Sequence, residues 1–459
     1  MRLAKAWLPL VFSITGACGQ AGADSPPGQS SAGQSAGGQG GSSASNDASP
    51  TGGSAGSAGG GSGGTAVGGS AGSGQAGSGG NCSDGCPAPN GGVSYRCQKR
   101  FMYGMNYAWH SFGADFGGIT SWNARGISAQ AAVHDQKLSD MAAHGASVVR
   151  WWVFPDLRGD GIAFGPNDLP TGLGGTALVD LAKALELAQK NDVYLMLCLF
   201  SFDAFRPGAT NSGLWVPGLA PIVKDSQKRT ALLEQVLRPF VRAAATSPNA
   251  DRVISWDVIN EPEWAMSGKS PHGDPDYAPI SGLETLTHAE MEGFVKNVIS
   301  LLRSESKALV TVGGTAMKWG HAWTGVDVDF YQVHMYDWTN QLWPYTDPPS
   351  KYGLVDKPLV IGEFPMDDLV PGVSYAKVVS SLWATGYAGA LSWQYDNSTP
   401  AGLAAVAAFA ATHPCETRYG SGSPRWVTAP EAARVRIDSQ DLHSLRFCRV
   451  EAGRPDCSR

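Results

Sequence analysis

The sequence lacks any stretch beyond its first residues that is long and apolar enough to cross a membrane. It also lacks an excess of positive charge, since 34 Lys and Arg residues stand against 40 Asp and Glu residues and the net charge is −6. Nucleic-acid-binding proteins usually carry a basic surface, which this balance does not provide. We therefore expect neither a spanning protein nor a partner of nucleic acids.

Residues 19–80 contain no aromatic residue, no Lys and no Arg, and their only charges are Asp24 and Asp47. They hold 23 of the 59 glycines of the chain, together with many Ser and Ala residues. Such a tract has too little apolar surface to offset the entropy lost on ordering, so the sequence predicts a disordered linker here. About 380 residues remain, which is enough for one large domain.

Residues 1–18 have the pattern of an export signal, a basic start followed by a short apolar run. Thr15-Gly16-Ala17-Cys18 resembles a bacterial lipobox, in which Cys18 is lipidated, whereas Ala21-Gly22-Ala23 fits an ordinary cleavage site. A lipid anchor followed by a long linker favours the first alternative. We expect a monomer that is secreted or held at the surface of a bacterium as an outer-membrane lipoprotein, attached through Cys18.

The chain has eight cysteines, and export predicts that some of them form disulfides. Cys198 lies inside the apolar run 193–200 and is predicted to be a buried free thiol. Zinc binding is a weaker alternative, because Cys82 and Cys86 have no second pair and no adjacent His. The disulfide candidates, whose pairing the sequence leaves open, flank the folded region on both sides: Cys82, Cys86, Cys97, Cys415, Cys448 and Cys457.

Eight short apolar runs, rich in Val, Ile, Leu and aromatic residues, have the composition of strands buried on both faces. They are residues 101–107, 146–152, 193–200, 252–260, 308–313, 328–335, 357–363 and 388–394. Apolar residues at helical spacing occur between them, over residues 178–188, 231–245 and 291–302. Eight strands that alternate with helices predict a (β/α)8 TIM barrel.

The expected barrel domain covers residues 81–413 and begins with a Cys-rich lead-in, and residues 414–459 form a Cys-containing extension. We expect the extension to pack near residues 82–97. An open doubly wound sheet is the alternative fold. No Gly-x-Gly-x-x-Gly follows the first strand, which counts against a dinucleotide-binding version of that sheet.

Two of the predicted strands end in a carboxylate. The fourth ends in Asn260-Glu261-Pro262 and the seventh in Gly362-Glu363-Phe364. In a barrel both side chains belong to the C-terminal rim, where the chemistry of this fold takes place. Either residue alone could simply pair or cap at a strand end. Together they form the pair that glycoside hydrolysis requires, one protonated carboxyl to donate a proton and one ionised carboxylate.

The segment Trp256-Asp257-Val258-Ile259-Asn260-Glu261-Pro262 resembles the fourth-strand signature of the clan A glycoside hydrolases, most closely the cellulase and mannanase type of family 5. The resemblance implies a retaining endo-β-glycosidase that hydrolyses a β-1,4-glucan or β-mannan through a covalent glycosyl-enzyme. No metal cluster is evident in the sequence, and we expect no cofactor. It implies Glu261 as the acid/base and Glu363 as the nucleophile. Further residues match the clan pattern: Arg150 and Tyr336 beside the nucleophile, Asn260 on the sugar 2-hydroxyl, His334 of the His-x-Tyr motif, and Trp393 under the reacting sugar.

The match has one departure. Many members of the family place a His after the third strand, and this chain has Ser201-Phe202-Asp203 there. A non-catalytic carbohydrate-binding barrel and a transglycosylase remain alternatives to the hydrolase. The sequence does not choose the polysaccharide.

Tryptophan is concentrated in the folded region, where 13 of the 15 residues lie between Trp109 and Trp393. Flat aromatic side chains suit the apolar faces of sugar rings. Trp109 follows the first strand, so it should reach the rim as a candidate for substrate contact, with simple packing under a loop as an equal alternative. Trp215, Trp264 and Trp338 lie in long loops and are weighed equally between sugar contact and simple packing. We expect four further tryptophans to be buried in the core: Trp151, Trp152, Trp256 and Trp383.

Overall fold

The computed structural model describes residues 85–367 and 369–420. The predicted signal, the linker, Cys18, Cys82, Cys448 and Cys457 lie outside the described residues. Within the described ranges, no helix combines the length and the apolarity needed to cross a membrane.

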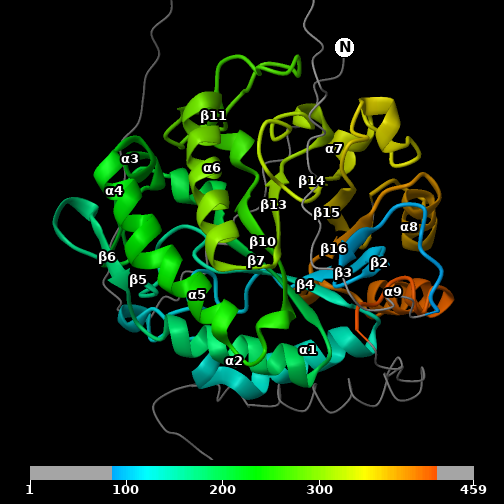
Figure 1. Cartoon of the computed structure of the whole chain (residues 1–459), viewed down its shortest axis with the longest axis horizontal. Coiled ribbons are helices and arrows are strands. Elements are labelled where there is room, and N and C mark those ends of the chain that lie inside the picture. The colour runs from blue at the N-terminus through cyan, green and yellow to red at the C-terminus, as the bar shows by residue number, and fades with distance from the viewer. Residues whose placement is uncertain (1–84, 368, 421–459) are drawn as a thin grey trace, which may run out of the picture. The chain divides into compact units, whose positions relative to one another are not determined.

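Eight parallel strands close into a barrel in chain order, which confirms the predicted TIM barrel (Figure 1). All eight predicted strands form, with ends shifted by at most a few residues. Every neighbouring pair is parallel, including the closing pair of the last and the first strand. The strands are β3 (Met102–Asn106), β4 (Val148–Trp152), β7 (Tyr194–Ser201), β10 (Val253–Asn260), β13 (Leu309–Gly314), β14 (Tyr331–His334), β15 (Leu359–Pro365) and β16 (Gly389–Trp393).

Helices surround the barrel, and their apolar faces pack on the outer side of the strands. They are α1 (Ala131–Ala143), α2 (Ala177–Lys190), α3 (Leu219–Lys224), α4 (Ser226–Ala231), α5 (Arg238–Thr246), α6 (His288–Glu305), α7 (Asp337–Asn340), α8 (Tyr375–Ala384) and α9 (Pro400–Thr412). The predicted helix over residues 231–245 forms, but it is not a regular α-helix along its whole length. A π-helical segment, Leu232–Leu237, joins α4 to α5 just before Pro239, whose ring lacks the N–H of a regular helical hydrogen bond.

The long loops at the C-terminal rim contain small elements of their own. They are the hairpins β5–β6 (Ile162–Phe164 and Pro170–Leu173) and β8–β9 (Ala209–Asn211 and Leu214–Val216), and the parallel pair β11–β12 (Met266–Ser267 and Leu286–Thr287). A further hairpin, β1–β2 (Val93–Tyr95 and Gln98–Arg100), precedes the barrel.

Alternate residues of a strand point into the barrel, and β4 shows what this does along the barrel axis. Val148 belongs to an apolar layer at the N-terminal end, together with Met102, Met196 and Ile254. Arg150 is fully buried one layer higher, among polar groups. Trp152 lies in a third layer, at the mouth. The barrel therefore has an apolar floor and a polar layer beneath an aromatic rim.

Aromatic rings and a disulfide close the N-terminal end of the barrel. Tyr95 and Tyr419 pack edge to face, with ring centroids 6.1 Å apart, and the Tyr419 hydroxyl donates to the Val93 carbonyl at 2.9 Å. Cys86 is bonded to Cys415, so the lead-in and the segment 414–420 are covalently joined. Cys198 is a buried free thiol, as predicted.

Candidate active site

Glu363, at the end of β15, is held by two donors. Arg150 Nη1 donates to its Oε1 at 2.7 Å, and the Tyr336 hydroxyl donates to its Oε2 at 2.7 Å. A shift in strand register lies between Ile361 and Phe364, and such irregularities re-aim side chains at the rim of a barrel. The structure therefore brings together the three residues that the sequence predicted to be neighbours.

Arg150 is itself fixed by a buried polar network. Its Nε donates to Asp257 Oδ2 at 2.9 Å, and its Nη1 donates to Asn106 Oδ1 at 3.0 Å. Gln332 Nε2 also donates to Asp257 Oδ2, at 2.9 Å. A Cβ at residue 313 would lie 2.8–3.0 Å from the side chains of Gln332, Arg150 and Asp257, so the network requires Gly313. Asp257 thus supports the site through Arg150.

Glu261 lies on the opposite side of the mouth, directly after β10. Its backbone has φ 49° and ψ 47°, a left-handed conformation that non-glycine residues rarely adopt and that is frequent at functional sites. His334 Nδ1 lies 2.7 Å from its Oε1, and Trp264 Nε1 donates to its Oε2 at 3.0 Å. Asn260, just before it, accepts from Arg150 Nη2 at 2.8 Å, which leaves the amide nitrogen of Asn260 as a donor.

The two carboxylates are close and differ in their surroundings. Oxygens of Glu261 and Glu363 lie within 4.8 Å of each other and of a ring nitrogen of His334. Burial raises the pKa of Glu261 to about 7. Burial also raises the pKa of Glu363, although His334, Arg150 and the Tyr336 hydroxyl act to lower it. Arg150 and the Tyr336 hydroxyl thus favour the ionised form of Glu363, but desolvation outweighs their effect on its pKa.

His334 completes the contact between the two carboxylates. Burial lowers the pKa of its imidazole to about 4, so the ring is neutral at neutral pH. These three residues offer atoms close enough to hold a metal, and His334 Nε2 has no hydrogen-bond partner among the described residues. Glu363 accepts from Arg150 and Tyr336, and His334 Nδ1 pairs with Glu261. Two close carboxylates in unlike surroundings can supply the protonated and the ionised member of an acid and nucleophile pair.

Aromatic side chains line the mouth in two groups. Trp109 and Trp393 lie 6.0 Å apart between ring centroids, and Trp152 lies 5.0 Å from Trp109 and 5.9 Å from Trp393. Beside Glu261, Trp264 lies 5.9 Å from Trp338. Trp109 and Trp393 thus belong to one aromatic group, and Trp264 and Trp338 belong to the other.

Other aromatic predictions had mixed outcomes. Trp215 is 51 % exposed and donates to Asp168 at 2.8 Å, outside both aromatic groups. Trp151 and Trp256 are core residues, as predicted. Trp152 is buried as predicted, but it belongs to a separate small cluster at the mouth, because it is two residues beyond Arg150 on the inward face of β4.

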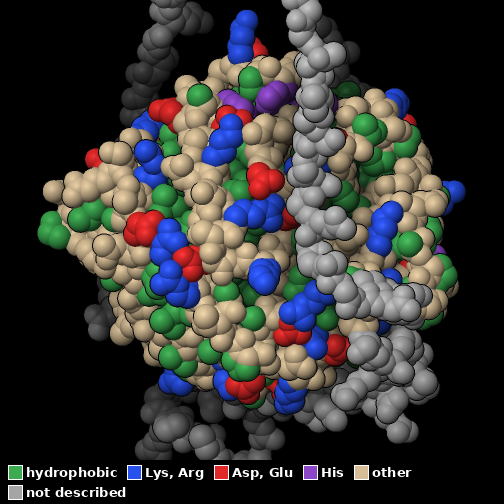
Figure 2. All heavy atoms as spheres, in the orientation of Figure 1, with side chains coloured by type: hydrophobic (Ala, Val, Ile, Leu, Met, Phe, Trp, Pro, Cys, Tyr) green, Lys and Arg blue, Asp and Glu red, His purple; other side chains and the backbone are tan. Residues whose placement is uncertain are grey.

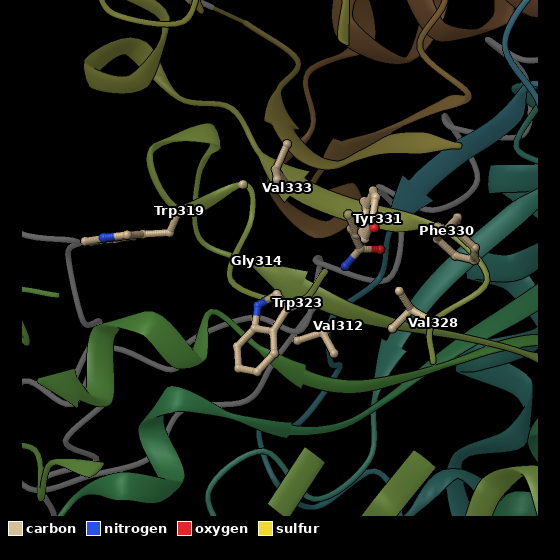
Figure 3. Close-up of a pocket in the computed structure, with 10 residues that line it drawn as sticks. Val312, Gly314, Trp319, Trp323, Val328, Phe330, Tyr331 and Val333 are labelled. Atoms are coloured by element: carbon tan, nitrogen blue, oxygen red, sulfur yellow. The ribbon is translucent and has the colours of Figure 1, made fainter. Parts of the chain in front are cut away.

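Sequence reasoning also missed Asn106 and Gln332. Both are polar residues in strands of largely apolar composition, and that contrast is a signal that could have identified them. Asp203, in the position after β7 where the family pattern has His, pairs with Arg206 at 3.0 Å. Figure 3 shows a narrow pocket between β13, β14 and the segment that carries Trp319 and Trp323, lined largely by apolar residues such as Val312 and Val333. It contains neither catalytic candidate and is distinct from the mouth.

The chain is similar to known mannanases in sequence. No protein-family model matches it. It is 27 % identical over 333 residues to the mannan endo-1,4-beta-mannosidase of Mytilus edulis, covering 66 % of this chain and 85 % of that protein. It is 27 % identical over 334 residues to the enzyme of the same name from Cryptopygus antarcticus, covering 66 % of this chain and 82 % of that protein. The predicted resemblance is confirmed, and the chain is a glycoside hydrolase.

Solved structures give the same fold for this glycoside hydrolase. The beta-1,4-mannanase of Aplysia kurodai matches with a TM-score of 0.61 at 23 % identity, covering 72 % of this chain and 99 % of that one. The endo-1,4-beta-mannanase of Eisenia fetida matches with a TM-score of 0.56 at 24 % identity, covering 73 % and 95 %. At these identities the structural similarity supports the barrel fold and nothing more specific.

Proposed function

We propose that the chain is a retaining endo-β-1,4-mannanase in which Glu363 is the nucleophile and Glu261 the acid/base. The observation that carries the proposal is the pair of carboxylates. Their oxygens lie within 4.8 Å of each other, and the two groups have different hydrogen-bond partners. Retaining glycosidases have carboxyl groups about 5–5.5 Å apart, whereas inverting enzymes need roughly 6.5–9.5 Å to admit a water. The short separation supports the retaining mechanism.

In the first step, Glu363 attacks the anomeric carbon while the bond from that carbon to the glycosidic oxygen breaks. Glu261 donates its proton to the departing oxygen, and its raised pKa keeps that proton bound near neutral pH. The product of this step is a glycosyl ester of Glu363, and the leaving sugar carries a new hydroxyl. The hydrogen bonds from Arg150 and Tyr336 favour the ionised form of Glu363 that attacks.

In the second step, Glu261, now ionised, takes a proton from a water molecule. The water oxygen bonds to the anomeric carbon, and the ester bond to Glu363 breaks. Glu363 leaves as a carboxylate, which Arg150 and Tyr336 again stabilise. Each residue is thereby returned to its starting protonation state, and the product has the same anomeric configuration as the substrate.

One observation supports mannan as the substrate, and another supports endo action. The relatives at 27 % identity are mannan endo-1,4-beta-mannosidases. The long rim loops place Trp264 and Trp338 on the side of Glu261, while Trp109 and Trp393 lie together elsewhere at the mouth. Aromatic platforms in separate groups suit a chain that extends through the site, which favours endo action.

We also propose that the enzyme is exported and tethered at the cell surface through Cys18, with residues 19–80 as the spacer. The lipobox-like segment and the composition of the spacer support this proposal. A mature N-terminus at Cys18 with an added lipid mass, measured by mass spectrometry of the protein made in a bacterial host, is the expected result. An unmodified N-terminus at residue 24 would contradict it.

The activity test uses the purified chain with mannan, glucomannan, cellulose and xylan. We expect release of mannose oligosaccharides from mannan, with β-anomers formed first, as followed by proton NMR with mannohexaose. Glu363→Gln and Glu261→Gln should each abolish most of the activity, while Glu186→Gln, a change in an exposed carboxylate, should not. Initial α-anomers would overturn the retaining mechanism, and activity confined to cellulose or xylan would overturn the substrate.

A further inference from the structure

A cluster of three metal-ligating side chains lies outside the active site, beside the first turns of α6. Atoms of His272, His288 and Glu292 that can bind a metal lie within 4.8 Å of one another. His272 is exposed on the loop between β11 and β12, His288 is buried and Glu292 is half-buried. Figure 2 shows histidine side chains gathered near the top of the view, where α6 begins in Figure 1.

The positions on α6 suit joint binding of one ion. His288 and Glu292 are separated by four residues, so they lie on the same face of the helix one turn apart. The same spacing brings two ligands to one metal in helical zinc motifs. The third ligand, His272, comes from the loop that follows the catalytic Glu261, so an ion here would join that loop to α6.

The tautomer and the ring orientation of His288 suit metal binding. Its Nε2 lies 2.9 Å from the carbonyl oxygen of Ala322, which can only accept, so Nε2 carries the proton and Nδ1 has the lone pair. A hydrogen bond from the other ring nitrogen to a carbonyl is the usual support of a metal-binding His. Tyr277 and Trp323 stack against the ring at centroid distances of 6.0 Å each, which fixes its plane.

The loop that carries His272 is held against the segment 319–321, which is followed by Ala322, the residue that contacts His288 of α6. Asp274 accepts hydrogen bonds from the backbone N–H of His321 at 2.9 Å and pairs with its ring at 2.8 Å. The Pro275 carbonyl accepts from Trp319 Nε1 at 3.0 Å. At Gly325 an added Cβ would lie 2.6 Å from Glu292 Oε1, so glycine leaves room for the carboxylate.

We propose that His272, His288 and Glu292 bind one divalent transition-metal ion, with Zn²⁺ as the best match to two imidazoles and a carboxylate. Tetrahedral zinc holds such donors about 2.0–2.2 Å from the ion, which places them roughly 3.3–3.5 Å apart. The ligand atoms lie within 4.8 Å of one another, somewhat farther apart than in such a site. A change of rotamer of the exposed His272 side chain would bring them to that spacing. Glu292 Oε2 already pairs with Lys296 at 3.0 Å, which leaves Oε1 for the ion. The ion would fix the loop between Glu261 and α6.

Zinc binding is measured on the full chain without an affinity tag, after treatment with EDTA, by calorimetric titration with zinc chloride. We expect about one equivalent to bind, and His272→Ala and Glu292→Gln each to weaken binding by roughly tenfold or more, since each removes or neutralises one of three ligands. His144→Ala, which removes a histidine that lies on α1's C-terminal end, should leave the affinity unchanged. Zinc should also raise the temperature of unfolding of the parent chain but not of the two ligand variants.

The active-site group of Glu261, His334 and Glu363 is the competing zinc site. Binding that survives His272→Ala and disappears in Glu363→Gln would overturn the proposal, as would the absence of stoichiometric binding. Circular dichroism without zinc shows whether each variant is folded. None of these measurements uses a polysaccharide, so their outcome is independent of the proposed mannanase activity.

Discussion

Arg150 and Glu363 form an ion pair that is almost entirely removed from water. Nη1 lies 2.7 Å from Oε1, and the side chains are 0 % and 4 % exposed. Arg150 also contacts Asp257 at 2.8 Å, so one guanidinium serves two buried carboxylates. Buried charges are tolerated only when they are paired and hydrogen-bonded, and here the pairing also positions the proposed nucleophile.

Arg150→Lys should preserve the fold better than Arg150→Ala but should still lower kcat/KM by about a hundredfold or more. Lysine keeps the positive charge but cannot make the forked contacts to Glu363, Asp257 and Asn260 together. Arg150→Ala leaves two buried carboxylates without their cation and should cost about 3–5 kcal/mol of unfolding free energy. Urea denaturation and mannan kinetics give the two values, and Arg242→Lys, in an exposed ion pair, is the control. Equal kinetics for Arg150→Lys and the parent would contradict the assigned role.

The dependence of kcat/KM on pH should be bell-shaped, with an alkaline limb near pH 7. Glu261 must be protonated to act as the acid, and burial raises its pKa to about 7, so activity falls as pH rises through that value. Glu363 must be ionised, and its pKa is raised by burial, so the acid limb should lie above the usual carboxyl pKa of about 4.3. Initial rates on mannohexaose across the pH range test both limbs.

The alkaline limb can be assigned with Glu261→Gln and an aryl mannoside whose leaving group needs no proton. Bond cleavage then no longer depends on an acid, so the variant should form the glycosyl-enzyme at a rate that does not fall near pH 7. Added azide should accelerate the second step, because a small anion can replace the water that lacks its base. Persistence of the alkaline limb in this variant would assign it to another group.

Trp109→Ala should lower kcat/KM on mannan by roughly tenfold or more, whereas Trp215→Ala should change it by less than about twofold. Trp109 packs with Trp152 and Trp393 at the mouth, where a sugar ring can stack. Trp215 is exposed and bonds to Asp168 away from both aromatic groups. The paired variants therefore compare two tryptophans of one chain. A larger loss for Trp215→Ala would show that substrate reaches the β8–β9 hairpin.

The barrel and the catalytic candidates could be predicted because both follow from local patterns. Apolar runs of strand length marked all eight strands, and Glu261 and Glu363 stood at the ends of two of them. Parallel strands deliver their ends to one rim, so the meeting of these residues required no knowledge of the loops. The predicted contacts of Arg150 and Tyr336 with Glu363 came from resemblance to the family, and the structure contains them.

What could not be predicted depends on register and on distant contacts. The inward orientation of Trp152 needs the register of β4, which a uniformly apolar strand does not reveal. The net upward shift of the Glu363 pKa needs the degree of burial, because the sequence indicates only the charged neighbours. The π-helical segment before Pro239 is invisible to a pattern that records apolar spacing alone. The pairing of Cys86 with Cys415 is one of many that six cysteines permit.

That disulfide leads to the last prediction, which concerns stability rather than chemistry. The bond joins residues 329 positions apart, and a cross-link over so long a loop removes much conformational freedom from the unfolded chain. The double variant Cys86→Ser, Cys415→Ser should therefore lose about 2–5 kcal/mol of unfolding free energy. Urea denaturation under oxidising conditions measures the loss, and the parent chain under the same conditions is the comparison.

The activity of the same variant should be unchanged at temperatures where it is folded. Cys415 precedes Glu416, whose carbonyl accepts from the N–H of Phe101 at the start of the first barrel strand, whereas Glu261 and Glu363 lie at the strand ends. The disulfide and the carboxylates thus occupy opposite ends of the barrel. A kcat/KM that falls together with stability would show that the lead-in positions the active site, and an unfolding free energy equal to that of the parent would show that the floor of the barrel is held by packing alone.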